Sequence, residues 1–139
     1  MKDYIFANNY IEGSNVSPQI GGLSIAYNSH PILMNTTIAN NHGSISNYDG
    51  AGGIVSTSGG DYSLINSIIW GNGSHSSHNI YNRVNEPFEA SISISYSNIE
   101  GGFENIGLSD DSIADNLTLD WLEGNINEDP VFLDPDLML

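Results

Sequence analysis

Residues 68–72 read Ile-Ile-Trp-Gly-Asn, and close variants of this phrase recur along the chain. The other copies are residues 5–9 (Ile-Phe-Ala-Asn-Asn), 37–41 (Thr-Ile-Ala-Asn-Asn) and 98–102 (Asn-Ile-Glu-Gly-Gly). When they are aligned on their second residue, successive copies lie 32, 31 and 30 residues apart. A repeat of this length is typical of solenoids, in which each repeat packs on its neighbours along one axis. The sequence therefore predicts a stack of similar rungs.

The segments that lead into these phrases have the composition of strands. Residues 31–38 and 62–69 are rich in β-branched side chains, and residues 90–97 alternate between apolar and polar. A second short strand also recurs once in each rung, at residues 22–25, 53–56 and 79–82. Strands that recur once per rung stack parallel to their own copies, whereas an antiparallel blade needs hairpins inside each repeat. We therefore expect an all-β chain that forms a parallel β-helix of about four rungs.

The repeat also predicts which side chains form the core. Equivalent aliphatic residues of successive rungs lie about 4.8 Å apart when parallel strands pair. Three columns are expected inside the coil: Ile38, Ile69 and Ile99; Leu33, Leu64 and Ile94; and Leu23, Ile54 and Ile80. A polar column is expected at the turn after the strand, where Asn tolerates a left-handed backbone and its amide can bond the adjacent rungs. Its members are Asn9, Asn41 and Asn72, with Gly102 in the same place in the last rung.

The chain resembles a known family at three stretches. These are residues 53–72, residues 94–102 and the closing run 124–135 (Gly-Asn-Ile-Asn-Glu-Asp-Pro-Val-Phe-Leu-Asp-Pro). They resemble secreted right-handed parallel β-helix repeat proteins of the pectate-lyase-like superfamily. The resemblance implies a right-handed coil and an extracellular or cell-surface setting in bacteria. It does not imply catalysis, because one fold carries many functions.

The chain is expected to divide near residue 102. Residues 1–102 are predicted to hold the β-helix rungs, and residues 103–139 to form an irregular, acidic C-terminal cap with a short helix from Ser112. Strand signals already begin within the first nine residues, and in the resembling proteins more chain follows the closing run. We therefore expect a fragment of a longer solenoid. Unpaired strand edges invite pairing with another chain, so self-association is predicted through the N-terminal rung, around residues 4–11.

Composition excludes several classes of function. The chain has no cysteine, so it has neither a thiol nucleophile nor a thiolate metal site. Its 17 acidic residues face only Lys2 and Arg83, for a formal net charge of −15. Nucleic acid is a poor partner for such a chain, because binding it requires positive charge against phosphates. No apolar run approaches the length of a membrane span, so no membrane insertion is expected, and no export signal lies in this chain.

The acidic residues also suggest a metal. Carboxylate oxygens are the ligands that calcium takes, although no calcium-loop spacing is present. The candidate calcium ligands are Asp110, Asp111, Asp115, Glu128, Asp129, Asp134 and Asp136.

Catalytic residues are not predicted. A polysaccharide lyase needs a basic side chain to abstract a proton, and only Lys2 and Arg83 could serve. A glycoside hydrolase needs two carboxylates on a common face, and Asp61, for example, looks like an isolated turn residue. The spacing of His75 and His78 suits a metal pair, but two ligands do not complete a zinc site.

Two classes of function remain. The first is a non-catalytic extracellular or cell-surface module: a structural spacer, an adhesin segment or a glycan-binding face with a polysaccharide as partner. The alternative is the remnant of a polysaccharide lyase or a glycoside hydrolase. For the first class, exposed aromatic contacts are expected from Tyr27, Tyr48, Tyr62, Trp70, Tyr81 and Tyr96.

Overall fold

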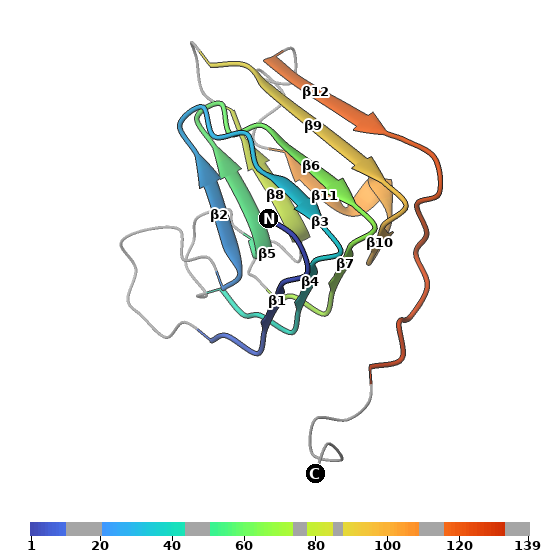
Figure 1. Cartoon of the computed structure of the whole chain (residues 1–139). Coiled ribbons are helices and arrows are strands. Elements are labelled where there is room, and N and C mark those ends of the chain that lie inside the picture. Colours follow the sequence, from blue (N-terminus) through green and yellow to red (C-terminus); the bar gives the residue numbers. More distant parts are fainter. Residues whose placement is uncertain (11–20, 44–50, 74–77, 85–87, 109–115, 133–139) are drawn as a thin grey trace.

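A computed structural model describes residues 1–10, 21–43, 51–73, 78–84, 88–108 and 116–132. In these residues, twelve strands form three parallel sheets of four strands each (Figure 1). Sheet I contains β3 (Ile32–Met34), β6 (Tyr62–Ile65), β9 (Ala90–Ser95) and β12 (Leu117–Trp121). Sheet II contains β1 (Ile5–Ala7), β4 (Thr37–Ala39), β7 (Ile68–Trp70) and β10 (Asn98–Ile99). Sheet III contains β2 (Leu23–Ala26), β5 (Ala51–Thr57), β8 (His78–Arg83) and β11 (Ile106–Leu108).

The chain passes through sheets I, II and III in turn and then begins the next rung. Every strand pairs in parallel with the strand about one repeat away in sequence, as β3 does with β6 and β6 with β9. The described residues therefore form a β-solenoid, and the predicted parallel stacking of repeated strands is confirmed. Each rung holds three strands, where the sequence indicated at least two.

The three predicted core columns are in register. Ile38 pairs with Ile69 and Ile69 with Ile99, and the columns of Leu33 and of Leu23 continue in the same way. Most of these side chains are fully buried, and each contributes about 1.5 to 3 kcal/mol by leaving water. The columns are also longer than predicted, because three further residues join their ends: Phe6, Ile106 and Trp121.

A ladder of asparagine amides, buried from Asn41 to Asn79, links the rungs at the turn after sheet II. The Asn9 side chain donates to Asn41 Oδ1 at 2.8 Å, and that of Asn41 donates to Asn72 Oδ1 at 3.0 Å. Gly102, which was predicted to take the same place in the last rung, has no side chain with which to continue the ladder. Asn72 instead donates to Asn79 Oδ1 at 3.0 Å, and Asn79 donates to the Glu100 carboxylate at 2.7 Å. All these amides donate in the same direction, and the last one donates to a carboxylate. Each hydrogen bond therefore polarises and strengthens the next.

A second ladder holds the turn between sheets I and II. Ser67 Oγ accepts the backbone N–H of Thr36, and Ser97 Oγ accepts that of Ser67, both at 3.1 Å. The residue just before this ladder has a positive φ in successive rungs, with 52° at Asn35 and 50° at Asn66. Asparagine adopts this conformation more readily than most residues, which explains its recurrence at the corner.

The predicted irregular cap is wrong for part of residues 103–139. After the short 3-10 helix η1 (Phe103–Asn105), β11 extends sheet III by pairing with β8. Strand β12 then extends sheet I by pairing with β9, and Ile126 forms an isolated bridge with Asn98. The repeat therefore continues past residue 102, because the apolar residues that the sequence assigned to a cap alternate along a strand. The helix predicted from Ser112 lies outside the described residues.

Candidate functional site

The outer face of sheet I carries polar side chains in register. On β9, Ile92 and Ile94 point into the core, so Ser91 and Ser93 lie on the opposite face. Ser93 pairs with Ser63 on β6 and with Asp120 on β12. The position that Ser93 occupies on this face is therefore polar in three successive rungs.

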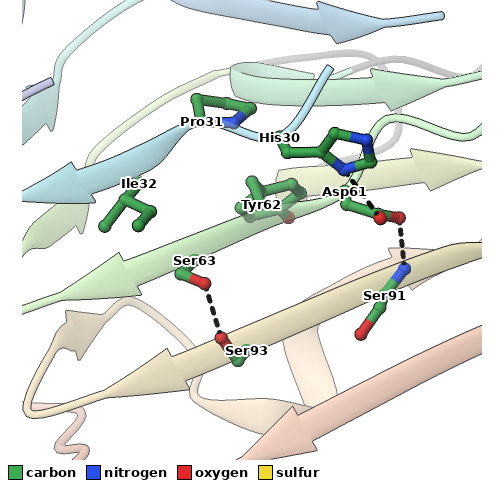
Figure 2. Close-up of a pocket in the computed structure, with 8 residues that line it drawn as sticks. All are labelled: His30, Pro31, Ile32, Asp61, Tyr62, Ser63, Ser91 and Ser93. Atoms are coloured by element: carbon green, nitrogen blue, oxygen red, sulfur yellow. Dashed lines mark hydrogen bonds and ion pairs between the residues drawn. The ribbon is translucent and has the colours of Figure 1, made fainter. Parts of the chain in front are cut away.

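Two adjoining depressions lie on this face, and we call them together the sheet I groove. The first has a volume of about 290 Å³ and is lined by His30, Pro31, Ile32, Asp61, Tyr62, Ser63, Ser91 and Ser93 (Figure 2). The second has a volume of about 310 Å³ and is lined by Asp61, Glu89, Ala90, Ser91, Asn116 and Thr118. Asp61 and Ser91 line both, so they mark the junction of the two depressions.

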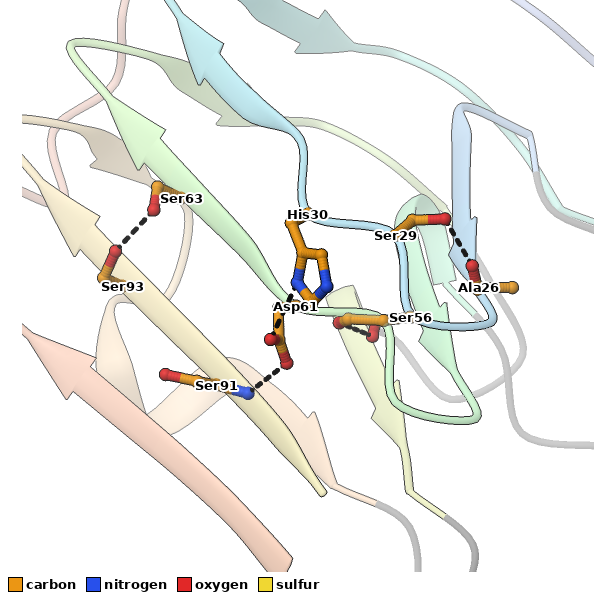
Figure 3. Close-up of polar contacts among 9 residues, drawn as sticks. Ala26, Ser29, His30, Ser56, Asp61, Ser63, Ser91 and Ser93 are labelled. Atoms are coloured by element: carbon orange, nitrogen blue, oxygen red, sulfur yellow. Dashed lines mark hydrogen bonds and ion pairs between the residues drawn. The ribbon is translucent and has the colours of Figure 1, made fainter. Parts of the chain in front are cut away.

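Asp61 connects three successive rungs at this junction. One carboxylate oxygen accepts the backbone N–H of Ser91 at 2.7 Å, and the other lies 2.9 Å from His30 Nδ1 (Figure 3). The His30 side chain is about two-thirds exposed, whereas that of Asp61 is about one-third exposed. Both carboxylate oxygens of Asp61 are therefore engaged by the protein, and the His30 ring faces solvent above them.

The rest of the first depression combines hydroxyl groups with an apolar edge. Ser93 Oγ donates to Ser63 Oγ at 2.8 Å, and Ile32 beside them is half exposed (Figure 2). The Tyr62 ring is buried, and its hydroxyl donates to Asn82 Oδ1 at 3.1 Å inside the coil. Burial raises the pKa of Tyr62. Tyr62 therefore belongs to the core and offers no hydroxyl to a ligand.

The described side chains of the groove offer hydrogen-bonding groups of several kinds. His30 and Asp61 resemble a base with the carboxylate that orients it, but no serine hydroxyl of the described residues bonds to the His30 ring. The groups present suit the recognition of a ligand rich in hydroxyl groups, because they offer donors, acceptors and an apolar edge.

Most of the predicted calcium ligands cannot be placed. Glu128 and Asp129 are exposed, and an oxygen of the Asp129 carboxylate accepts the backbone N–H of Val131 at 2.9 Å. Among the described residues, no group of three histidine or acidic side chains could hold a metal ion. The remaining candidates lie outside the described residues: Asp110, Asp111, Asp115, Asp134 and Asp136. The calcium site stays a prediction.

His78, one of the two histidines whose spacing suits a metal pair, makes contacts within the protein. His78 stacks on Tyr81, with ring centroids 6.2 Å apart, and its Nδ1 lies 3.2 Å from the carbonyl oxygen of Asn105, so it packs within the protein. His75 lies outside the described residues. These contacts indicate a structural role for His78.

Of the predicted aromatic contacts, Tyr62 and Tyr81 are wrong because both are buried. Tyr27 and Tyr96 are exposed as expected, and Trp70 is half-buried. The Tyr96 hydroxyl donates to the Glu123 carboxylate, and this bond raises the pKa of Tyr96. Tyr48 lies outside the described residues.

Sequence reasoning missed the groove although its signal was present. Residues 90–95 alternate, and the same pattern that buries Ile92 exposes Ser91 and Ser93. The sequence suggests that Asp61 is an isolated turn residue, but the structure places it in contact with His30, and Asp61 and Glu89 line one depression. Extending the repeat alignment to polar positions would have placed His30, Asp61 and Ser91 in one column.

Comparisons with protein families, with curated proteins and with solved structures found no match to this chain. The resemblance to the pectate-lyase-like superfamily therefore stays a prediction from the sequence motifs. No helix in the described part of the chain is long and apolar enough to cross a membrane.

Proposed function

We propose that this chain is a non-catalytic module of a secreted or cell-surface protein, and that the sheet I groove binds a polysaccharide. The observation that carries the proposal is the groove itself, in which two depressions share Asp61 and Ser91 on a polar sheet face. The coil is proposed to be right-handed, as almost all crossover connections between parallel strands are.

The rigidity of the fold supports this proposal. Groove residues on β3, β6, β9 and β12 are held at a fixed spacing by parallel pairing and by core columns below them. A preformed surface spends little conformational entropy on binding. Sheet III is a weaker candidate, because Val55 and Tyr81 on its outer side are buried.

A pair of matched substitutions tests the proposal. Ser91→Leu fills the junction of the two depressions, and Ser24→Leu places the same side chain at an exposed position of sheet III. A glycan array with and without calcium identifies a ligand, and titration then measures its affinity for each variant. We expect Ser91→Leu to weaken binding about tenfold or more, equivalent to at least about 1.4 kcal/mol, and Ser24→Leu to leave it unchanged. Equal affinities for the two variants would place the binding surface elsewhere.

The alternative, the remnant of a polysaccharide lyase or a glycoside hydrolase, draws support from the His30–Asp61 contact and from Asp61 and Glu89, two acidic residues that line one depression. Incubating the chain with each glycan that it binds and measuring newly formed chain ends separates the two functions. Release of ends that is abolished by His30→Ala would favour the enzyme.

A further inference from the structure

The two carboxylates that line the sheet I groove differ in their contacts with the described part of the chain. Both oxygens of Asp61 are engaged, by Ser91 N–H and by His30. Glu89, in contrast, is exposed and makes no hydrogen bond or ion pair with any other described residue. Glu89 lines the second depression together with Ser91 and Thr118. A charged partner in the ligand would therefore meet Glu89 without displacing a contact within the protein.

The sign of the charge around the groove is negative. Asp120 stands on the same face, in register with Ser93, and neither Lys2 nor Arg83 lines either depression. The net charge of −15 adds a long-range field of the same sign. An acidic sugar would therefore be repelled, whereas a protonated amine would be attracted.

We propose that the sheet I groove selects glycans that carry free amino groups, a step that rests on the proposed glycan-binding function. The Glu89 carboxylate takes the ammonium group of an amino sugar in the second depression. The hydroxyl groups of Ser91 and Thr118 exchange hydrogen bonds with the hydroxyl groups of the same sugar. In the first depression, Ile32 offers an apolar contact.

Three probes of equal length test this selectivity: a de-N-acetylated chitin oligosaccharide, its N-acetylated counterpart and an oligogalacturonate. Affinities are measured by calorimetry at low salt and at a pH at which the amine is protonated. The variants are Glu89→Gln and a matched control, Glu104→Gln, which removes the same charge from the exposed helix η1 outside the groove.

We expect the amino oligosaccharide to bind most tightly, the oligogalacturonate to bind least, and added salt to reduce the difference. Glu89→Gln should weaken binding of the amino oligosaccharide about 1.5- to 5-fold, the range for an exposed ion pair. The same variant should leave the affinity for the acetylated form unchanged, and Glu104→Gln should alter neither affinity.

The possible failures are distinguishable. If no glycan binds, the proposed function falls and this inference falls with it. If the amino and acetylated forms bind equally and Glu89→Gln has no effect, only the selectivity is refuted. Equal weakening by Glu89→Gln and Glu104→Gln would indicate general attraction of a polycation and would overturn the site. Tight calcium-dependent binding of oligogalacturonate would overturn it as well.

Discussion

The contact between Tyr62 and Asn82 offers a sharp test of the core. Both side chains are buried, and the Tyr62 hydroxyl donates to Asn82 Oδ1 at 3.1 Å. The amide nitrogen of Asn82 has no hydrogen-bond partner among the described residues, so this polar pair is only partly satisfied there. A buried polar group without a partner costs about 1 to 3 kcal/mol, whereas replacing both partners by apolar groups is close to neutral.

The perturbation is a double-mutant cycle of Tyr62→Phe and Asn82→Leu. Tyr62→Phe leaves neither Oδ1 nor Nδ2 of Asn82 with a described partner, and it should lower the free energy of unfolding by about 1 to 3 kcal/mol. Asn82→Leu leaves the Tyr62 hydroxyl unpaired, which lowers stability. Burial of the new aliphatic side chain inside the coil partly offsets this loss of stability. Register places Asn82 in one column with Ser56 and Ile25, and Ile25 is buried, so an aliphatic side chain is already accommodated in this column.

The double variant should be at least as stable as the unmodified protein, because no unpaired polar group remains. The expected coupling free energy is about 1 to 3 kcal/mol, within the range for residues in contact. Urea unfolding followed by circular dichroism measures all four proteins, with the exposed Tyr27→Phe as a control that should change nothing. A coupling below about 0.5 kcal/mol would refute the reasoning, since independent sites agree to within that margin.

Four further predictions concern the core, pH, metal and assembly. Ile69→Ala should lower the free energy of unfolding by about 2 to 5 kcal/mol, because Ile69 is fully buried in a column; an unchanged denaturation midpoint would contradict its core role. Burial raises the pKa of Tyr62 above its ordinary value of 10.0, so the folded protein holds this proton more tightly. Stability should therefore fall as pH rises above about 10, and Tyr62→Phe should show a shallower fall in urea midpoints measured across that range. Calcium should raise the melting temperature more than sodium chloride of equal ionic strength if the acids after Glu100 bind it; equal shifts would mean screening alone. Light scattering at several concentrations should detect self-association through residues 4–11, where Ile5 is exposed, and Ile5→Lys should reduce it; a monomer at high concentration would exclude that surface.

The repeat, the parallel pairing of its strands and the core columns can all be predicted from the sequence. These follow from local facts, since apolar and β-branched residues at a period near 31 residues can be buried together only by stacking equivalent strands. The repeat alone therefore predicts that Ile38, Ile69 and Ile99 share one column, and the observed register agrees.

The polar contacts that depart from the repeat could not be predicted from the sequence, because they depend on the tertiary structure. The amide ladder leaves the predicted column after Asn72. Its next member is Asn79, which lies only seven residues further along the chain, and its last hydrogen bond is to the Glu100 carboxylate. Such contacts depend on the path of the chain between strands, which composition does not specify. The contact of Asp61 with His30 and Ser91 depends in the same way on how side chains of different rungs turn toward one another over a finished sheet. Burial of apolar side chains determines which strands stack, but only the assembled coil determines which polar groups meet on its surface.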